Sequence, residues 1–125
     1  MKGNQLLLAK RSPHREFYPA VWDLVGGHCE QGESPSQTLQ RELVEEIGIT
    51  PKEFSLLRIL KESHAHGEYE FYVYLVTTWR GTPMNRQPDE HSEIQWFALH
   101  EARQLDLAHS KYYDLIEEID DCPSI

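Results

Sequence analysis

Three glutamates at helical spacing are the residues of this sequence best placed to do chemistry. Glu42, Glu45 and Glu46 stand at positions i, i+3 and i+4, so in a helix their side chains share one face and repel each other. Arg41 points about 100° away from Glu42, but it can pair with Glu45 four residues later. A hard divalent cation would offset the remaining repulsion, because Mg²⁺ takes oxygen ligands and completes its shell with water and substrate phosphates. A solvated acidic helix face is the alternative interpretation.

A glycine-rich loop precedes these carboxylates. The Gly26-Gly27 pair allows a backbone path that brings a carbonyl or an amide close to a ligand, and Gly32 and Glu33 then lead into the helix. A loop shaped by glycine, a capped helix and a carboxylate cluster together predict a site for phosphate and metal.

The helix that must position the carboxylates has clear start and stop signals. Ser34 is a natural N-cap, Pro35 suits the first helical position and Gln37 completes a capping box, while Gly48 provides the C-terminal stop. We therefore expect a helix over residues 35–47. Its buried stripe is predicted from apolar residues at four-residue spacing: Leu39, Leu43 and Ile47.

Strand and helix signals alternate along the rest of the chain. A turn at His66-Gly67 joins two long strands into a hairpin, and the second of these is rich in aromatic and β-branched residues. We expect one α/β domain with a mixed sheet, spanning residues 1–125. The predicted strands are 5–10, 21–25, 54–63, 69–79 and 93–98, and the predicted later helices are 99–105 and 110–120.

Composition limits the classes of partner and location. Twelve Lys and Arg against 21 Asp and Glu give a net charge of −9, which argues against a nucleic-acid polymer or an anionic membrane as the main partner. Small anionic substrates stay open, because a bound divalent cation reverses the local field. No apolar run approaches the roughly 20 residues of a membrane span, and no signal peptide is visible. The two distant cysteines, Cys29 and Cys122, exclude a disulfide scaffold and favour a cytoplasmic location.

The segment from Gly27 to Ile49 resembles the Nudix box, G-x5-E-x7-R-E-U-x-E-E-x-G-U, in which U is a bulky aliphatic residue. Every fixed position is filled. The resemblance implies an α/β/α sandwich around a mixed sheet and hydrolysis of a diphosphate bond in a nucleoside diphosphate linked to another group. Relatives usually carry one more strand before residues 5–10. We therefore expect either a true start further upstream or a sheet that lacks the first strand, whose edge a second copy could cover in a homodimer.

The same resemblance implies roles for individual residues. The metal ligands would be Glu42, Glu45, Glu46 and the carbonyl of Gly26, holding two or more Mg²⁺ or Mn²⁺ ions. The residues that shape the box would be Gly27, Glu33, Arg41 and Gly48. The general base that accepts the water proton would be Glu46, Glu90 or Glu93, and the sequence does not choose among them.

Substrate contacts must come from outside the box, and each candidate has a plain structural alternative. Arg11 is either a phosphate contact or a surface arginine. Phe17, Tyr18 and Trp22 precede the box and either stack on a base or pack in the core. His64 and His66 share one strand face and are candidates for nucleotide contact, with a histidine metal site as the weaker interpretation.

Residues 82–97 resemble, loosely, the corresponding region of MutT-like Nudix members that act on nucleoside triphosphates. We therefore expect Mg²⁺-dependent hydrolysis of a (deoxy)nucleoside triphosphate, canonical or oxidised, to a monophosphate and pyrophosphate. The alternatives are a hydrolase of nucleotide sugars or ADP-ribose, a nucleotide sensor without catalysis, and a prenyl diphosphate isomerase that would use Cys29.

Overall fold

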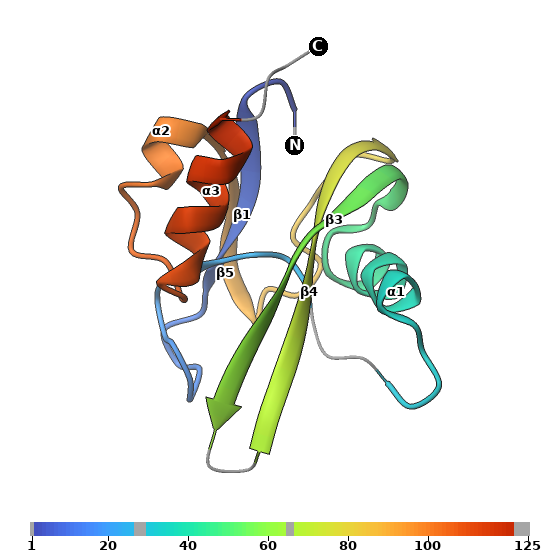
Figure 1. The fold of residues 1–125 in the computed structure, drawn as a ribbon, viewed down its shortest axis with the longest axis horizontal. Coiled ribbons are helices and arrows are strands. Elements are labelled where there is room, and N and C mark those ends of the chain that lie inside the picture. The colour runs from blue at the N-terminus through green and yellow to red at the C-terminus, as the bar shows by residue number, and fades with distance from the viewer. Residues whose placement is uncertain (1, 27–29, 65–66, 122–125) are drawn as a thin grey trace.

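The computed structural model describes residues 2–26, 30–64 and 67–121, and it describes side chains in these ranges except at 62–64, 67–69 and 121. In Figure 1, α1 lies on one side of the strands, and α2 and α3 lie on the other. The elements are β1 (Gln5–Arg11), β2 (Trp22–Asp23), α1 (Pro35–Ile47), β3 (Thr50–His64), β4 (Gly67–Arg80), β5 (His91–Ala98), α2 (Leu99–Ala102) and α3 (Lys111–Asp121).

The strands divide into two sheets rather than one. The first has the order β2-β1-β5 and the second is the β3-β4 hairpin, and both are antiparallel. Within the described ranges, the parallel pairing is an isolated bridge between Trp22 and Leu107. The central strand β1 contacts both β2 and β5, so it holds the loop after β1 next to the start of β5.

The hairpin is longer than its sequence pattern predicts. Its ladder runs from the Thr50–Arg80 pair to the His64–Gly67 pair. Gly67 is therefore the first residue of β4 and not part of the predicted turn, and His66 lies outside the described residues. The register shifts between Pro51 and Phe54 and again between Leu56 and Arg58. Such irregularities interrupt the alternation of apolar and polar residues, so the sequence signal begins only after the first shift.

Helix α1 has the predicted bounds and the predicted caps. The hydroxyl of Ser34 accepts the N–H of Gln37 at 3.2 Å, and the Gln37 side chain accepts the N–H of Ser34 at 2.9 Å. Gly48 ends the helix in the left-handed conformation, with φ at +72°. Leu43 and Ile47 are buried as expected. The carboxylates therefore stand on a helix with both ends fixed.

Two apolar clusters support this arrangement. The one under α1 has a buried centre of Leu43, Ile47 and Ile49. The larger cluster packs α2 and α3 against the strands, and its largest buried members include Leu8, Trp22, Phe97, Tyr112 and Ile116. None of the helices in the described part of the chain has the length and apolarity needed to cross a membrane.

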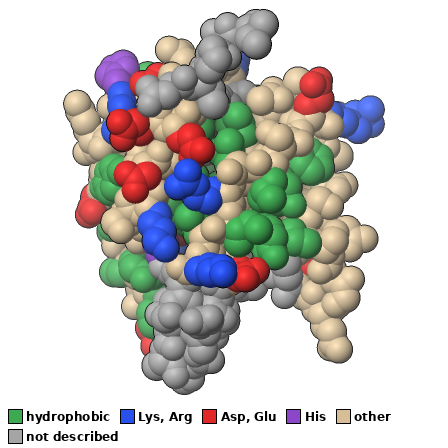
Figure 2. All heavy atoms as spheres, viewed as in Figure 1, with side chains coloured by type: hydrophobic (Ala, Val, Ile, Leu, Met, Phe, Trp, Pro, Cys, Tyr) green, Lys and Arg blue, Asp and Glu red, His purple; other side chains and the backbone are tan. Residues whose placement is uncertain are grey.

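One face of the molecule carries exposed apolar side chains. Figure 2 shows them gathered over the β3-β4 hairpin, and Leu56, Ile59 and Tyr72 are exposed there. Next to them, an ion pair between Arg58 and Glu118 at 2.7 Å joins β3 to α3.

Candidate metal centre

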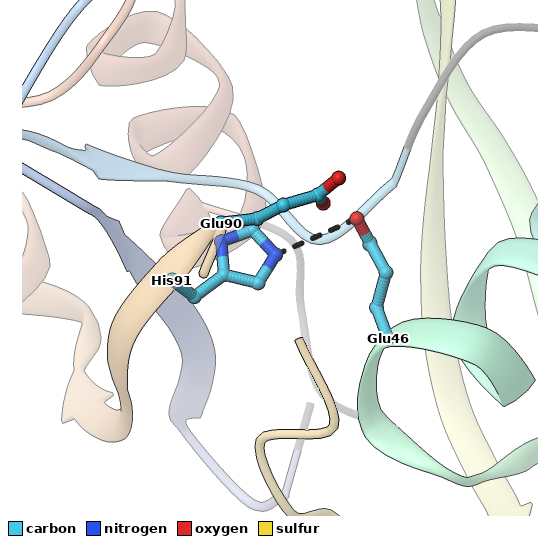
Figure 3. A group of neighbouring side chains, drawn as sticks. All are labelled: Glu46, Glu90 and His91. Carbon is cyan, nitrogen blue, oxygen red and sulfur yellow. Dashed lines mark ion pairs between the residues drawn. The ribbon is translucent and has the colours of Figure 1, made fainter. Parts of the chain in front are cut away.

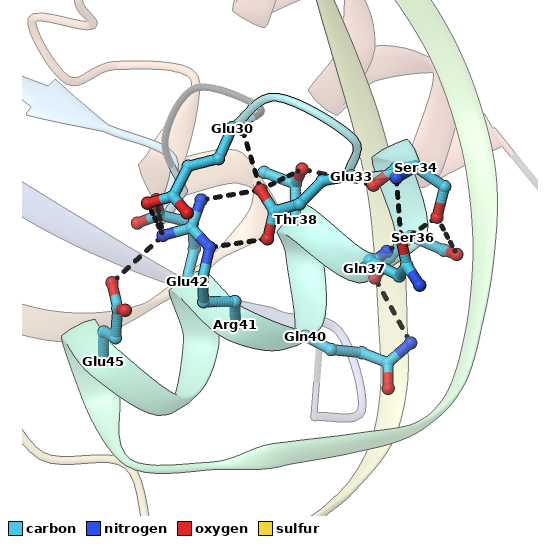
Figure 4. Close-up of polar contacts among 10 residues, drawn as sticks. All are labelled: Glu30, Glu33, Ser34, Ser36, Gln37, Thr38, Gln40, Arg41, Glu42 and Glu45. Atoms are coloured by element: carbon cyan, nitrogen blue, oxygen red, sulfur yellow. Dashed lines mark hydrogen bonds and ion pairs between the residues drawn. The ribbon is translucent and has the colours of Figure 1, made fainter.

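A bidentate ion pair joins the loop before α1 to the middle of that helix. Arg41 donates from Nε to Oε2 of Glu33 at 2.7 Å and from Nη2 to Oε1 at 3.0 Å (Figure 4). The same carboxylate accepts the Glu30 N–H and the Thr38 hydroxyl. Arg41, and next the Glu30 N–H, lower the pKa of Glu33 to about 2. The structure thus joins two of the residues to which the resemblance assigns a role in shaping the box.

Arg41 also contacts two of the glutamates on its own helix. Its Nη1 donates to Oε1 of Glu42 at 2.8 Å and to Oε2 of Glu45 at 3.2 Å. The expectation that the Arg41 side chain points away from Glu42 is wrong for its guanidinium group. The long side chain bends back over the helix surface and brings the guanidinium to the Glu42 carboxylate. Nη1 also lies 3.7 Å from Oε1 of Glu30. One cation therefore serves four carboxylates, and the pKa of Arg41 is raised, mainly by its hydrogen bonds to Glu33.

The three helix glutamates lie in different environments. The Glu46 side chain is 6% exposed, that of Glu42 13% and that of Glu45 52%. Burial, and then the charge of Glu46, raise the pKa of Glu42 although Arg41 acts in the opposite direction. The unfavourable charge density is therefore concentrated at Glu42 and Glu46, where a cation would relieve it.

Glu46 meets the first residue of β5, His91, and the residue just before that strand, Glu90. One ligand atom each from Glu46, Glu90 and His91 lies within 4.8 Å of the other two (Figure 3). Nε2 of His91 is 3.4 Å from Oε1 of Glu46, and both side chains are buried, whereas Glu90 is exposed. The sequence pattern predicts a strand only from residue 93, so it does not identify His91 as a site residue. The signal in the sequence that could have found His91 is its position next to Glu90, a candidate base.

Backbone hydrogen bonds fasten the segment before β5 to the end of α1. The N–H groups of Met84 and Arg86 donate to the carbonyls of Ile47 and Glu46, at 3.0 and 2.9 Å. These carbonyls belong to the last turn of a helix, where no intrahelical donor remains. The segment that carries Glu90 is therefore attached to the residue whose side chain it approaches.

Not every candidate joins this group. Glu93 is exposed on β5, with Lys10 opposite it on β1. Gly26 is exposed at the edge of the described region, and Gly27 lies outside it. Gly48 acts as the C-cap of α1.

The substrate candidates fall into separate environments. Arg11 donates to the carbonyls of Phe17 and Tyr18 and to the Asp23 carboxylate, so it holds the loop after β1. Phe17 is 66% exposed on that loop. Trp22 is buried and packs edge-on against Phe97, with ring centroids 4.8 Å apart. Of the two alternatives for Trp22, this contact fits packing in the core and not stacking on a nucleobase.

Three of the histidines and cysteines considered in the sequence analysis cannot be placed. His66, Cys29 and Cys122 lie outside the described residues, and so does the side chain of His64.

The residues present suit a divalent cation. Oε2 of Glu46 is buried and has no hydrogen-bond partner in the described part of the chain, and the same holds for both ring nitrogens of His91. Buried polar atoms are rarely left unpaired, and a carboxylate beside a second carboxylate is a donor set for Mg²⁺ or Mn²⁺.

Comparison with known proteins points to one family. The family model described as the NUDIX domain matches residues 1–119. The 8-oxo-dGTP diphosphatase of Escherichia coli (strain K12) is 33% identical over 91 residues, which cover 71% of this chain and 70% of that protein. The enzyme of the same name from Haemophilus influenzae is 33% identical over 107 residues, covering 86% and 77%. The crystal structure of a MutT NUDIX hydrolase from Burkholderia pseudomallei superposes with a TM-score of 0.84 at 29% identity, covering 95% of this chain and 91% of that one.

Proposed function

This chain belongs to the Nudix family of hydrolases, and we propose that it hydrolyses a (deoxy)nucleoside triphosphate, canonical or oxidised, to a monophosphate and pyrophosphate. The observation that carries the proposal is the buried carboxylate of Glu46 beside Glu42 on the helix of the Nudix box, because Oε2 of Glu46 has no hydrogen-bond partner among the described residues. The names of the two diphosphatase relatives support a triphosphate substrate.

Nudix hydrolases depend on divalent metals in general, and the proposed ions here are two or more of Mg²⁺ or Mn²⁺. Glu42, Glu45 and Glu46 would hold them, with the carbonyl of Gly26 and the carboxylate of Glu90 as further oxygen donors. A bound cation of this kind neutralises phosphate charge and lowers the pKa of water, which makes water a nucleophile near neutral pH.

Other roles in the proposed reaction fall to charged side chains around the metal site. Arg41 favours the ionised forms of Glu33 and Glu42, and with Glu33 it holds the loop against α1. Among the three candidate bases, the geometry favours Glu90, whose exposed carboxylate lies beside Glu46. The Glu90 carboxylate would hold the ion through one oxygen and accept the proton of the attacking water with the other. Glu46 is buried and better placed to bind, and Glu93 lies outside the group.

Phe17 is the candidate for stacking on the nucleobase. Its ring is exposed, while the carbonyls of Phe17 and Tyr18 are fixed by the Arg11 guanidinium. A fixed loop presents an aromatic face with little loss of conformational freedom on binding. Direct contact of Arg11 with a phosphate stays a prediction, as do contacts from His64 and His66.

The domain organisation, the cellular location and the oligomeric state also stay predictions. The single domain over residues 1–125 is supported by the family match over 1–119. The prediction of a cytoplasmic location rests on the composition. Sedimentation velocity tests the predicted homodimer.

The test of the proposed function is a product assay with Mg²⁺ across triphosphates, ADP-ribose, nucleotide sugars and dinucleoside polyphosphates. Phosphate and pyrophosphate are measured separately. Pyrophosphate released from one triphosphate well above all others supports the proposal. Preferred cleavage of ADP-ribose or a nucleotide sugar contradicts the substrate class, and nucleotide binding without turnover favours a sensor.

A further inference from the structure

We propose that His91 is a nitrogen ligand to a divalent cation bound between Glu46 and Glu90, which makes this part of the site a mixed nitrogen and oxygen site that takes transition-metal ions. The inference rests on the proposed metal site, and it adds a ligand that does not belong to the glutamates of the Nudix box. It concerns which ions the site accepts and not which nucleotide is cleaved.

The three side chains converge on one volume. Figure 3 shows the imidazole of His91 and the carboxylate of Glu46 pointing toward each other, with Glu90 reaching the same space. Their nearest ligand atoms lie within 4.8 Å of one another. Three donors at this spacing can share one ion after only small side-chain movements, because metal–ligand distances near 2.1 Å place neighbouring ligand atoms roughly 3 Å apart.

The contact between His91 and Glu46 is incomplete by itself. Nε2 lies 3.4 Å from Oε1, yet neither ring nitrogen nor Oε2 of Glu46 has a hydrogen-bond partner within the described ranges. A ring nitrogen without hydrogen and a carboxylate oxygen both offer lone pairs, which repel unless a positive centre lies between them. A cation bound by Nε2, by the Glu46 carboxylate and by exposed Glu90 satisfies the facing nitrogen and the carboxylate together.

The backbone holds His91 in place before any ion binds. The side-chain amide of Asn85 donates to the carbonyl of His91 at 2.6 Å, and the carbonyl of Gln87 accepts the N–H of His91 at 2.9 Å. Since the N–H of Arg86 in the same segment donates to the carbonyl of Glu46, one hydrogen-bonded segment positions both the imidazole and the carboxylate. Ligands held in this way bind a metal with little loss of conformational entropy.

The donor chemistry indicates the class of ion. Carboxylates alone suit Mg²⁺ and Mn²⁺, whereas imidazole adds affinity for the later first-row ions. His91 is therefore expected to raise the affinity for Co²⁺ more than the affinity for Mg²⁺.

The experiment is proton NMR of the Co²⁺-loaded protein with ¹⁵N-labelled histidine side chains. Coordination predicts an exchangeable, strongly shifted imidazole N–H signal in the wild type, lost in His91→Gln and kept in His100→Gln, the matched variant of an exposed histidine on α2. Calorimetry should show the Co²⁺ affinity falling at least about ten-fold in His91→Gln. The Mg²⁺ affinity should change much less.

Two results would overturn the inference. The first is wild-type protein that binds Co²⁺ without a shifted imidazole N–H, and this result stands even if His91→Gln does not fold. The second is a shifted signal that persists in folded His91→Gln, since another histidine would then be the ligand. A failure of Co²⁺, Mn²⁺ and Mg²⁺ to bind at all would overturn the proposed metal site as well, which separates the two claims.

Discussion

The guanidinium of Arg41 and the carboxylate of Glu33 face each other through two parallel hydrogen bonds, Nε to Oε2 at 2.7 Å and Nη2 to Oε1 at 3.0 Å. The contact spans eight residues and joins the loop before α1 to the helix that carries the proposed metal-binding glutamates. Bidentate geometry is what distinguishes it from an ordinary surface ion pair.

Replacing Glu33 with Gln should remove a stabilising effect that depends on pH. The pKa of Glu33 is lowered from 4.5 to about 2 in the folded protein, so its ionised form favours folding above pH 4.5. This contribution is lost as the pH falls toward 2. In urea unfolding, the difference in unfolding free energy between wild type and Glu33→Gln should therefore be largest near neutral pH. It should disappear by about pH 2.

The matched control is Glu118→Gln, which breaks the exposed pair with Arg58. Exposed ion pairs contribute little to stability, so the unfolding free energy of Glu118→Gln should stay close to that of the wild type at every pH. A Glu33→Gln gap that does not change with pH would contradict the role assigned to the bidentate pair.

Gly48→Ala should destabilise the protein by about 1–2 kcal/mol, because φ at +72° disfavours any residue with a Cβ. The new Cβ would also lie 2.7 Å from Nε of Arg86, which must move. Gly3→Ala is the control, since Gly3 has φ at +58° with nothing within 4 Å of a Cβ. Thermal unfolding should show the smaller loss for Gly3→Ala, and equal losses would mean that the Arg86 contact carries no cost.

Much of the fold could be predicted from local signals. The caps at Ser34 and Gly48 act within one turn of the chain, and they define α1 to the residue. The division into two sheets could not be predicted, because it depends on which strands meet in space. Register shifts hid the start of β3, and only the ladder with β4 shows that it begins at Thr50.

The site divides in the same way. The carboxylates of α1 and the Glu33–Arg41 pair lie within one continuous motif, so their spacing identifies them. His91 could not be assigned, because its meeting with Glu46 depends on hydrogen bonds between the segment before β5 and the end of α1. The separate roles of Phe17 and Trp22 likewise follow from burial in the tertiary structure.

Phe17→Ala and Trp22→Ala should separate substrate binding from stability. Trp22 is buried in the larger cluster, so its loss should cost about 3–5 kcal/mol of unfolding free energy. Phe17 is exposed, so its loss should change stability by less than about 0.5 kcal/mol. Loss of base stacking should raise KM for the triphosphate about ten-fold in Phe17→Ala, with a smaller effect on kcat. An unchanged KM would exclude Phe17 from the substrate site.

Divalent ions should stabilise the folded protein. Mg²⁺ at about 100 times its Kd should add about 2.7 kcal/mol, and chelator should reverse the gain in Tm. The pKa of Glu42 is raised, so its charge opposes folding as the pH rises, and a bound cation should relieve this effect. The gain in Tm should therefore grow with increasing pH, because protons compete with the metal. A gain that is the same at acid and neutral pH would contradict Glu42 as a ligand.

The most direct test of the central claim is the rate of pyrophosphate release from the best triphosphate substrate, in Mg²⁺, by wild type, Glu45→Gln and Glu46→Gln. Glu117→Gln, an exposed glutamate on α3, is the matched control. The account predicts that turnover falls at least about 100-fold in Glu46→Gln and also falls in Glu45→Gln, while the variants stay folded and the control keeps its activity. Unchanged turnover in both Glu45→Gln and Glu46→Gln would contradict the assignment of the metal site and the function built on it.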